Sequence, residues 1–395
     1  MQVLVLNSGS SSLKFQLFSM PDQTILCSGQ IERIGFNDSI FKFKNQKESI
    51  EFETPILNHK AGLKLVSQNL LDKNIGVITT PEEINIVGHR VVHGGSSFSN
   101  TTEITKTVKE KIKALIPLAP LHNPANLEGI EVAEDIFPSA KQVAVFDTAF
   151  HQSIPEHAYK YAIPNEFLTE NKIRLYGFHG TSHKYVSEKA IEFLGKTESK
   201  IITIHLGNGC SMTAIKNGES IDHSLGFSPL AGLIMGTRSG DIDPSIIFHL
   251  KDKLGYSLKE INNILNKKSG MLGLTGYSDL RDIEIMAAKG NKDCQLALHM
   301  NAYRIKKYIG SYAAILNGLD AIVFTAGIGE NSTLMRQLVC ENMDFLGIDL
   351  DIEENKIRSK GLHEINTKES KVKILVIPTN EELEIAKQSV ALFKN

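Results

Sequence analysis

The amino-acid sequence predicts an α/β protein of two domains, and three observations carry that prediction. A chain of 395 residues exceeds the roughly 250–300 residues at which single hydrophobic cores stop growing. Short apolar runs alternate with segments of helical apolar spacing through about the first 150 residues, which is typical of α/β folds. A second cycle of the same kind begins near residue 200.

The first half opens with short strands that follow one another closely. Residues 2–6 and 13–18 are β-rich runs on either side of a small-residue turn, and 25–34 and 39–45 continue the pattern. Helices are expected at 60–72, 106–116 and 126–136, and strands at 84–92 and 141–147. The cycle ends near Phe150, where we place the domain boundary.

The second half repeats the opening scheme of strand, small-residue turn and strand. With an offset of 200, Ser8–Ser11 aligns with Asn208–Ser211, as expected if two halves of one fold were joined. Helices are then expected at 257–266, 280–289, 293–317 and from about Ser332, with strands at 320–327 and 371–378. Asn380 can cap a closing helix with one apolar face over 380–394.

Composition excludes several classes of function. A net charge of -2 without a basic bias does not suit nucleic acid, so any anion must be bound by a local site. The four cysteines are far apart without a CxxC pair, which argues against a zinc cluster or a disulfide framework and fits a reducing cytoplasm. No run approaches the ~18 apolar residues that cross a membrane, and no basic segment precedes the first apolar run. Neither secretion nor membrane insertion is therefore expected.

Three loops of small residues follow apolar strands: NSGSSSLK at 7–14, HLGNGCS at 205–211 and TAGIGEN at 325–331. Small side chains and glycine let backbone N–H groups approach an anion, and Lys14 adds a cation to the first loop. One such loop is equally well a polar hairpin, and the Walker A spacing is absent. Three of them favour a nucleotide whose phosphates are contacted from several loops.

Two arginines and one histidine lie among small residues in other stretches of the chain: Arg90 in GHRVVHGG, Arg238 in MGTRSGDIDP and His179 in YGFHGTSH. Arg90 and Arg238 suit a forked grip on carboxylate or phosphate oxygens, although either one alone is more often the structural partner of a carboxylate. His179 and His183 have helical i, i+4 spacing, but the HEXXH pattern of zinc peptidases is absent. We therefore expect His179 to donate a hydrogen bond to a phosphoryl oxygen.

Asp147 and Glu381 are carboxylates at the ends of expected elements. Each could be a helix-capping acid or a ligand of Mg²⁺, which typically takes one or two protein carboxylates and shares its other positions with water and phosphate. One acid from each end of the chain would suffice for such a site.

Together these stretches resemble the acetokinase family of the acetate and sugar kinase, Hsc70 and actin superfamily. VLVLNSGSSSLKF and YGFHGTSHKYV are similar to the two signatures of that family. HLGNGCS, MGTRSGDIDP, TAGIGEN and TNEEL occur in the family's order. The resemblance covers essentially the whole chain.

The resemblance implies two domains, each a duplicated ribonuclease H-like (actin-like ATPase) mixed sheet flanked by helices, with the active site in the interdomain cleft. The N-terminal domain would comprise residues 1–150 and be completed by a C-terminal helix at 381–395. The nucleotide-binding domain would comprise residues 151–380. The family is also homodimeric, and we expect a homodimer.

The resemblance also implies a role for each matching residue. It places Asn7 and Glu381 on Mg²⁺ (Mn²⁺ as a substitute), Arg90 on the acyl substrate, Asp147 as catalytic acid, and His179 and Arg238 as stabilisers of the transition state. Nucleotide-binding residues would be Ser10, Ser12, Lys14, His205, Leu206, Gly207, Asn208, Gly209, Asp279, Leu280, Arg281, Gly327, Ile328, Gly329, Glu330 and Asn331. Val92, Leu121, Phe178 and Pro229 would form an apolar pocket for the substrate methyl group.

The activity implied is reversible, direct in-line phosphoryl transfer from ATP to acetate, giving acetyl phosphate and ADP. Acetate is already ionised at pH 7, so no base is needed, and we expect Asp147 to organise the site more than to carry a proton. Propionate kinase activity is the alternative within the family, because one methylene is worth only ~1–3 kcal/mol in an apolar pocket. Butyrate kinases differ in their NPGSTSTK-like opening. A non-catalytic module like actin or Hsp70 is disfavoured, because it gives Arg90, His179 and Arg238 no task.

Overall fold

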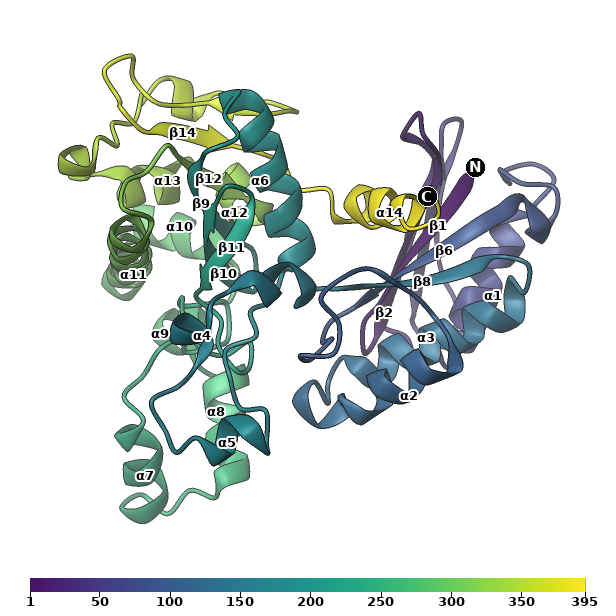
Figure 1. Cartoon of the computed structure of the whole chain (residues 1–395), viewed down its shortest axis with the longest axis horizontal. Helices are drawn as coiled ribbons and strands as arrows, with labels where there is room; N and C mark the ends of the chain where they lie inside the picture. The colour runs from purple at the N-terminus through teal and green to yellow at the C-terminus, as the bar shows by residue number, and fades with distance from the viewer. Residues whose placement is uncertain (395) are drawn as a thin grey trace. The chain divides into compact units, whose positions relative to one another are not determined.

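The computed structural model describes residues 1–394 and divides into two compact units. The first unit is Met1–Phe150 together with the C-terminal residues from Asn380 onward, and the second is His151–Thr379. Each unit contains one mixed sheet flanked by helices (Figure 1). No helix among the described residues is both long and apolar enough to cross a membrane.

The sheet of the first unit has the strand order β5-β4-β3-β2-β1-β6-β8-β7. Its strands are β1 (Gln2–Ser8), β2 (Ser12–Ser19), β3 (Thr24–Glu32), β4 (Ile40–Asn45), β5 (Ser49–Glu53), β6 (Ile84–Val91), β7 (Thr102–Glu103) and β8 (Lys141–Phe146). Strands β1 to β5 pair antiparallel, whereas β1, β6 and β8 are parallel to one another. The carboxyl ends of these three parallel strands therefore share one edge of the sheet.

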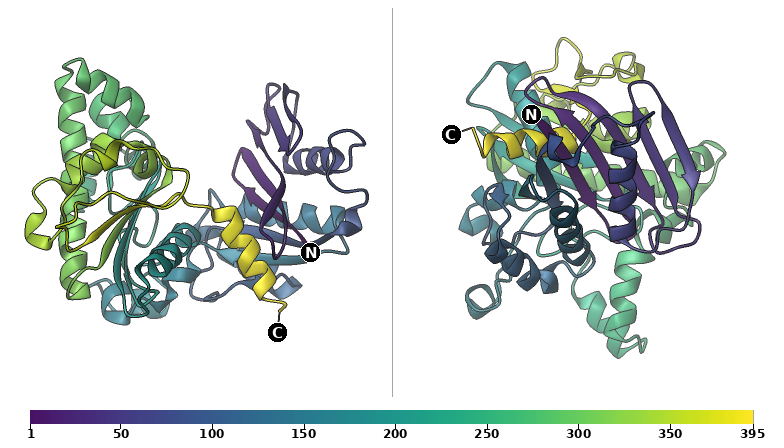
Figure 2. Two further views of the ribbon diagram at one scale, coloured as in Figure 1. Left: turned by 90° about the horizontal axis from the view of Figure 1, so that it is seen from above. Right: turned by 90° about the vertical axis from the view of Figure 1, so that its right-hand side faces the viewer.

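Side chains alternate between the two faces of this sheet, and each face is buried under helices. Leu4 and Leu6 pack with α1 (His59–Leu70) and α3 (Asn123–Ile136), next to which α2 (Lys106–Ala114) lies. Val3 and Val5 pack instead against α14 (Glu381–Ala391). Figures 1 and 2 show α14 in yellow beside the purple and blue strands of the unit. The last helix of the chain thus completes the core that the first strand begins.

The sheet of the second unit has the order β11-β10-β9-β12-β14-β13. Its strands are β9 (Lys200–Leu206), β10 (Cys210–Lys216), β11 (Glu219–His223), β12 (Ala321–Thr325), β13 (His363–Glu364) and β14 (Lys373–Val376). Strand β9 pairs antiparallel with β10 and parallel with β12, just as β1 pairs with β2 and β6. The repeat found in the sequence therefore marks equivalent hairpins in the two sheets.

Helices surround the second sheet, with α6 and α11 packed on its central strands. The helices are α4 (Glu156–Tyr159), α5 (Glu166–Thr169), α6 (Gly180–Leu194), α7 (Ser245–Asp252), α8 (Leu258–Lys267), α9 (Gly270–Thr275), α10 (Leu280–Ala288), α11 (Lys292–Leu316), α12 (Ala326–Asn331) and α13 (Thr333–Cys340). In Figure 1, α7 and α8 extend away from the sheet of their unit.

Candidate active site

Four predicted residues of the first unit lie at the carboxyl edge of its parallel strands. Asn7 lies near the end of β1, Arg90 near the end of β6, and Asp147 immediately after β8. Glu381 is the first residue of α14, whose cap is the Asn380 side chain accepting from the backbone N–H of Leu383. Residues far apart in the sequence are thus collected at one place by the strand order.

Arg90 is the centre of this group. Its Nε lies 3.1 Å from both carboxylate oxygens of Asp147, and its Nη2 lies 2.5 Å from Oδ2 of Asp147. Its Nη1 donates to Oδ1 of Asn7 at 3.2 Å. Burial alone would lower the pKa of Arg90, but the charges of Asp147 and Glu381 outweigh it, and the pKa lies above its ordinary value. A guanidinium has five N–H groups, so each terminal nitrogen keeps an N–H for a ligand.

Glu381 is held in a strongly charged environment. Burial raises its pKa to about 7, with Arg90 opposing and Asp147 adding to the rise. A raised carboxyl pKa means that the ionised form lacks compensating positive charge. A bound cation would supply that charge.

The first small-residue loop connects β1 to β2 beside this group. Asn7 pairs with Lys14 across the hairpin, so both side chains project from the same face of the sheet. Lys14 and the Glu382 side chain line one cavity of about 390 Å³. Within the loop, the N–H of Gly9 donates to the carbonyl of Ser12 at 2.8 Å, and Ser10 is exposed at its tip.

The oxygen donors of this edge fit a hard divalent cation. They are the Asn7 carboxamide oxygen and the carboxylates of Asp147 and Glu381, which are the ligand types that Mg²⁺ prefers. No group of three or more His, Cys, Asp or Glu residues within residues 1–394 could hold a metal by itself. The donor set therefore suits a cation that shares its coordination sphere with a phosphorylated ligand and water.

In the second unit, the side chains of His179 and Arg238 both lie beside the backbone of Gly209. A Cβ added to Gly209 would lie 3.4 Å from Cε1 of His179 and 3.8 Å from Nη1 of Arg238. The same guanidinium donates to the carbonyl of Pro229 at 3.0 Å. Burial lowers the pKa of Arg238, and among the described residues no carboxylate forms an ion pair with it. Arg238 thus places an uncompensated cation next to the His179 ring.

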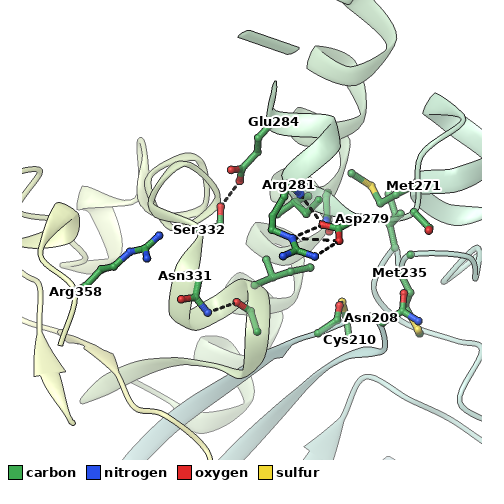
Figure 3. Close-up of a pocket in the computed structure, with 18 residues that line it drawn as sticks. Asn208, Cys210, Met235, Met271, Asp279, Arg281, Glu284, Asn331, Ser332 and Arg358 are labelled. Atoms are coloured by element: carbon green, nitrogen blue, oxygen red, sulfur yellow. Dashed lines mark hydrogen bonds and ion pairs between the residues drawn. The ribbon is translucent and has the colours of Figure 1, made fainter. Parts of the chain in front are cut away.

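A cavity of about 800 Å³ opens in the second unit, within the size range of small-molecule sites. Three of the segments that line it are predicted to bind nucleotide (Figure 3). The residues of these segments that line the cavity are Gly207, Asn208, Asp279, Leu280, Arg281, Gly327, Ile328 and Asn331. The side chains of Arg281 and Asp279 pair with each other, and Asn331 donates to the carbonyl of Gly327 at 2.8 Å.

Five further residues of the second unit that are predicted to bind the nucleotide lie outside the lining of this cavity: His205, Leu206, Gly209, Gly329 and Glu330. The ring of His205 stacks on that of His179 with centroids 4.5 Å apart. Glu330 accepts from the N–H of Thr379 at 3.2 Å, and burial raises its pKa. Of these five, His205 and Gly209 therefore lie beside His179.

The four predicted methyl-pocket residues are divided between the units. Val92 is buried and Leu121 is 63% exposed in the first unit. In the second unit, Phe178 immediately precedes His179, and the carbonyl of Pro229 is bound to Arg238. The apolar pocket itself stays a prediction.

Several residues that line the 800 Å³ cavity could not be predicted from the sequence. Met235, Met271, Asn301 and Arg358 also line it. Asn301 is 3% exposed, and its Oδ1 makes no hydrogen bond to any part of the chain that the structure describes. It lies within α11 without a motif, so no signal in the sequence could have singled it out.

Comparison with known proteins gives matches over the full length of the chain. The sequence model of the acetokinase family matches residues 2–387. The acetate kinase of Flavobacterium johnsoniae is 67% identical over 395 residues, and the alignment covers both proteins over their full lengths. Among solved structures, acetate kinase of Porphyromonas gingivalis has a TM-score of 0.94 at 47% identity, with both chains fully covered. A propionate kinase from Francisella tularensis has a TM-score of 0.92 at 45% identity, covering 99% of each chain.

Proposed function

Because the chain belongs to the acetokinase family, we propose that it is an ATP:acetate phosphotransferase. It transfers the γ-phosphoryl group of ATP directly and in line to acetate, reversibly, giving acetyl phosphate and ADP. The observation that carries the proposal is the convergence of three distant segments on one cavity of about 800 Å³. The nucleotide binds to these segments in the second unit.

Acetate and the phosphates of ATP are both anions, so the protein's main task is to neutralise charge. Arg90 binds the acyl substrate, and Lys14, Ser10 and Ser12 bind phosphate. His179 and Arg238 stabilise the charge on the migrating phosphoryl group, as an arginine does in other phosphoryl transfers. Asp147 holds the Arg90 guanidinium through two of its nitrogens, which supports its role as an organiser of the site.

Mg²⁺, or Mn²⁺ in its place, is held by the Asn7 carboxamide oxygen and the Glu381 carboxylate. When bound, it neutralises charge on the phosphate oxygens. The raised pKa of Glu381 supports this assignment, since a cation compensates the negative charge that burial disfavours.

Propionate kinase activity is the second candidate, favoured by the likeness to the propionate kinase from Francisella tularensis. The two activities are separated by trapping the acyl phosphate with hydroxylamine in parallel reactions with acetate, propionate and butyrate. We expect the highest kcat/KM with acetate. A higher kcat/KM with propionate would establish the second candidate. If none of the three acids gave an acyl hydroxamate, both candidates would be refuted.

The chain forms a homodimer in the cytoplasm. Apolar side chains of the α7–α8 region support the association, because Phe248, Leu254 and Leu258 are about 60% exposed and exposed apolar patches mark interaction surfaces. All four cysteines are free, which fits a reducing compartment. Light scattering coupled to size-exclusion chromatography tests the dimer, and a monomer at micromolar concentration would contradict it.

A further inference from the structure

We propose that Ser211 is a positioning residue for His179, keeping a proton on Nε2 of the His179 ring, which lies beside Gly209 as Arg238 does. The inference rests on the proposed function, in which His179 donates a hydrogen bond to the migrating phosphoryl group. Ser211 lies on β10 and is fully buried, so it acts only through its neighbours.

The backbone of His179 is held in an unusual conformation. His179 has φ 56° and ψ 25°, the left-handed region that a non-glycine residue adopts at a cost. The preceding carbonyl, that of Phe178, lies 3.0 Å from Nε2 of His151 and 2.8 Å from Nε2 of His223. The N–H of Leu225 donates to Nδ1 of His223 at 2.8 Å, so the His223 proton is on Nε2 and is donated to this carbonyl. This bond fixes the peptide from which the His179 ring projects.

Ser211 holds the other side of the ring. Its Oγ lies 2.9 Å from Nδ1 of His179 and 2.7 Å from Nε2 of His183. Nδ1 of His183 lies 2.7 Å from Oγ1 of Thr203. Burial, together with neighbouring imidazoles, holds the pKa of His183 well below its ordinary value. His183 is therefore neutral and has one N–H, on one nitrogen or the other.

This chain of groups has two arrangements of its protons. In the first, Thr203 donates to Nδ1 of His183, Nε2–H of His183 donates to Ser211, and Ser211 donates to Nδ1 of His179. His179 is then neutral with its proton on Nε2. In the second, all three hydrogen bonds reverse, and the fully buried Thr203 hydroxyl then has no acceptor for its own proton among the described residues. The first arrangement satisfies every donor of this buried chain and is therefore favoured, and it presents Nε2–H of neutral His179.

Nε2 of His179 and the Arg238 guanidinium both lie beside Gly209. A Cβ added to Gly209 would lie 3.5 Å from Nε2 of His179 and 3.8 Å from Nη1 of Arg238. The ring of His205 stacks on His179 at an interplanar angle of 21°, which restricts rotation. Without the Ser211 hydroxyl, neutral His179 can carry its proton on Nδ1, and a bare Nε2 would repel a phosphoryl oxygen.

The test compares Ser211→Ala with Thr213→Val. Thr213 lies two residues along the same strand and is also fully buried, but its Oγ1 makes no hydrogen bond to any residue in 1–394. We expect Ser211→Ala to lower kcat roughly ten- to a hundredfold, the usual loss when the partner of a functional histidine is removed. KM values should stay within about threefold, and Thr213→Val should resemble the wild type. If the alanine variant does not fold, Ser211→Cys keeps the volume and replaces the hydroxyl by a weak donor.

Two further readouts separate positioning from packing. The ¹⁵N chemical shifts of the His179 ring should show Nε2–H in the wild type and a mixture of tautomers in Ser211→Ala. Adding Ser211→Ala to a His179→Gln variant should lower kcat no further. Unchanged ring shifts in Ser211→Ala, or an equal loss of kcat in the His179→Gln background, would overturn the proposal. If the wild type formed no acyl phosphate, the proposed function would be refuted instead. The ¹⁵N shifts of the His179 ring would still test whether Ser211 sets the tautomer of that ring.

Discussion

At the scale of single residues, two arginines of the candidate site differ in their partners. Arg90 forms an ion pair with Asp147, whereas Arg238 forms none with any carboxylate that the structure describes. Arg90 is held by Asp147 and Asn7. Within residues 1–394, the Arg238 guanidinium forms hydrogen bonds only with the carbonyl of Pro229 and the sulfur of Met235. A partnered guanidinium is preorganised for a ground-state ligand. An uncompensated one gains most when negative charge develops next to it.

We therefore predict that Arg238→Ala lowers kcat by roughly 10³, the order found for arginines that stabilise phosphoryl transfer, while the KM for acetate changes little. Arg281→Ala is the matched control, because Arg281 lines the nucleotide cavity and its loss should raise the KM for ATP. Steady-state kinetics in acetate and ATP measure both. A large rise in acetate KM with kcat unchanged would make Arg238 a ground-state binder.

Asp147→Asn tests whether this carboxylate organises the site. The Asn side chain cannot balance the charge of Arg90, so we expect a higher acetate KM and a lower kcat, with both limbs of the pH–rate profile retained. Asp320→Asn is the control, since it removes an ion pair with Lys196 in the other unit. Loss of one limb with an unchanged dependence on Mg²⁺ would show that Asp147 transfers a proton.

At the scale of elements, helices with an apolar stripe could be predicted, and helices without one could not. The helices expected at 60–72, 280–289 and 293–317 correspond to α1, α10 and α11 within a few residues. Helix α6 was not expected, because its buried residues include Gly180, Thr181, Ser182 and His183 and so give no apolar periodicity. Residues 326–331, expected as a loop, form the short helix α12 directly after β12. Short edge strands such as β7 and β13 also have too few residues to show alternation.

The cap of α14 gives a prediction at this scale. Asn380→Ala removes the hydrogen bond to Leu383 and should lower the free energy of unfolding by about 1 kcal/mol. It should also raise the Mg²⁺ concentration for half-maximal activity, because Glu381 begins this helix. Asn58→Ala removes the equivalent cap of α1 and should cost similar stability without changing the Mg²⁺ requirement. Equal effects of the two variants on Mg²⁺ would contradict the assignment of Glu381.

At the scale of the whole molecule, the strand order explains which parts of the site the sequence could predict. Motif residues such as Asn7, Arg90 and Asp147 were found because they follow apolar strands, and parallel pairing then collects them at one edge. Asn301 was not, since only tertiary packing brings α11 to the cavity. Ser211 belongs to the predicted loop at 205–211, but its contact with His179 is set by tertiary packing in the same way. Contacts of that kind leave no local pattern in a single sequence.

Buried histidines in both units make stability depend on pH. Burial lowers the pKa of His89 and His93 to about 4 and that of His151 to about 3, and the pKa values of His183 and His223 also lie well below the ordinary one. The unfolded chain binds protons at these histidines near pH 6.5, and the folded chain does not. These histidines therefore make their full contribution to the free energy of unfolding above pH 6.5. As the pH falls below 6.5, that contribution decreases by about 1.4 kcal/mol per pH unit for each histidine.

Urea unfolding at pH 7.5 and pH 5 measures this effect. We expect a clearly lower midpoint at pH 5, because five histidines outweigh Asp222 and Glu381, whose raised pKa values act in the opposite sense. His89→Gln should make the pH dependence shallower. Equal midpoints at the two pH values would show that the buried histidines are protonated in the folded chain.

The central claim is that bound ATP reacts with a carboxylate. It is tested most directly by measuring ADP and acetyl phosphate together in the presence of Mg²⁺, with and without acetate. We predict that ADP release depends on acetate, that ADP and acetyl phosphate form in equal amounts, and that Arg90→Ala suppresses both. ADP release that is independent of acetate, with no acetyl phosphate formed, would contradict the account and indicate a nucleotide-driven module instead.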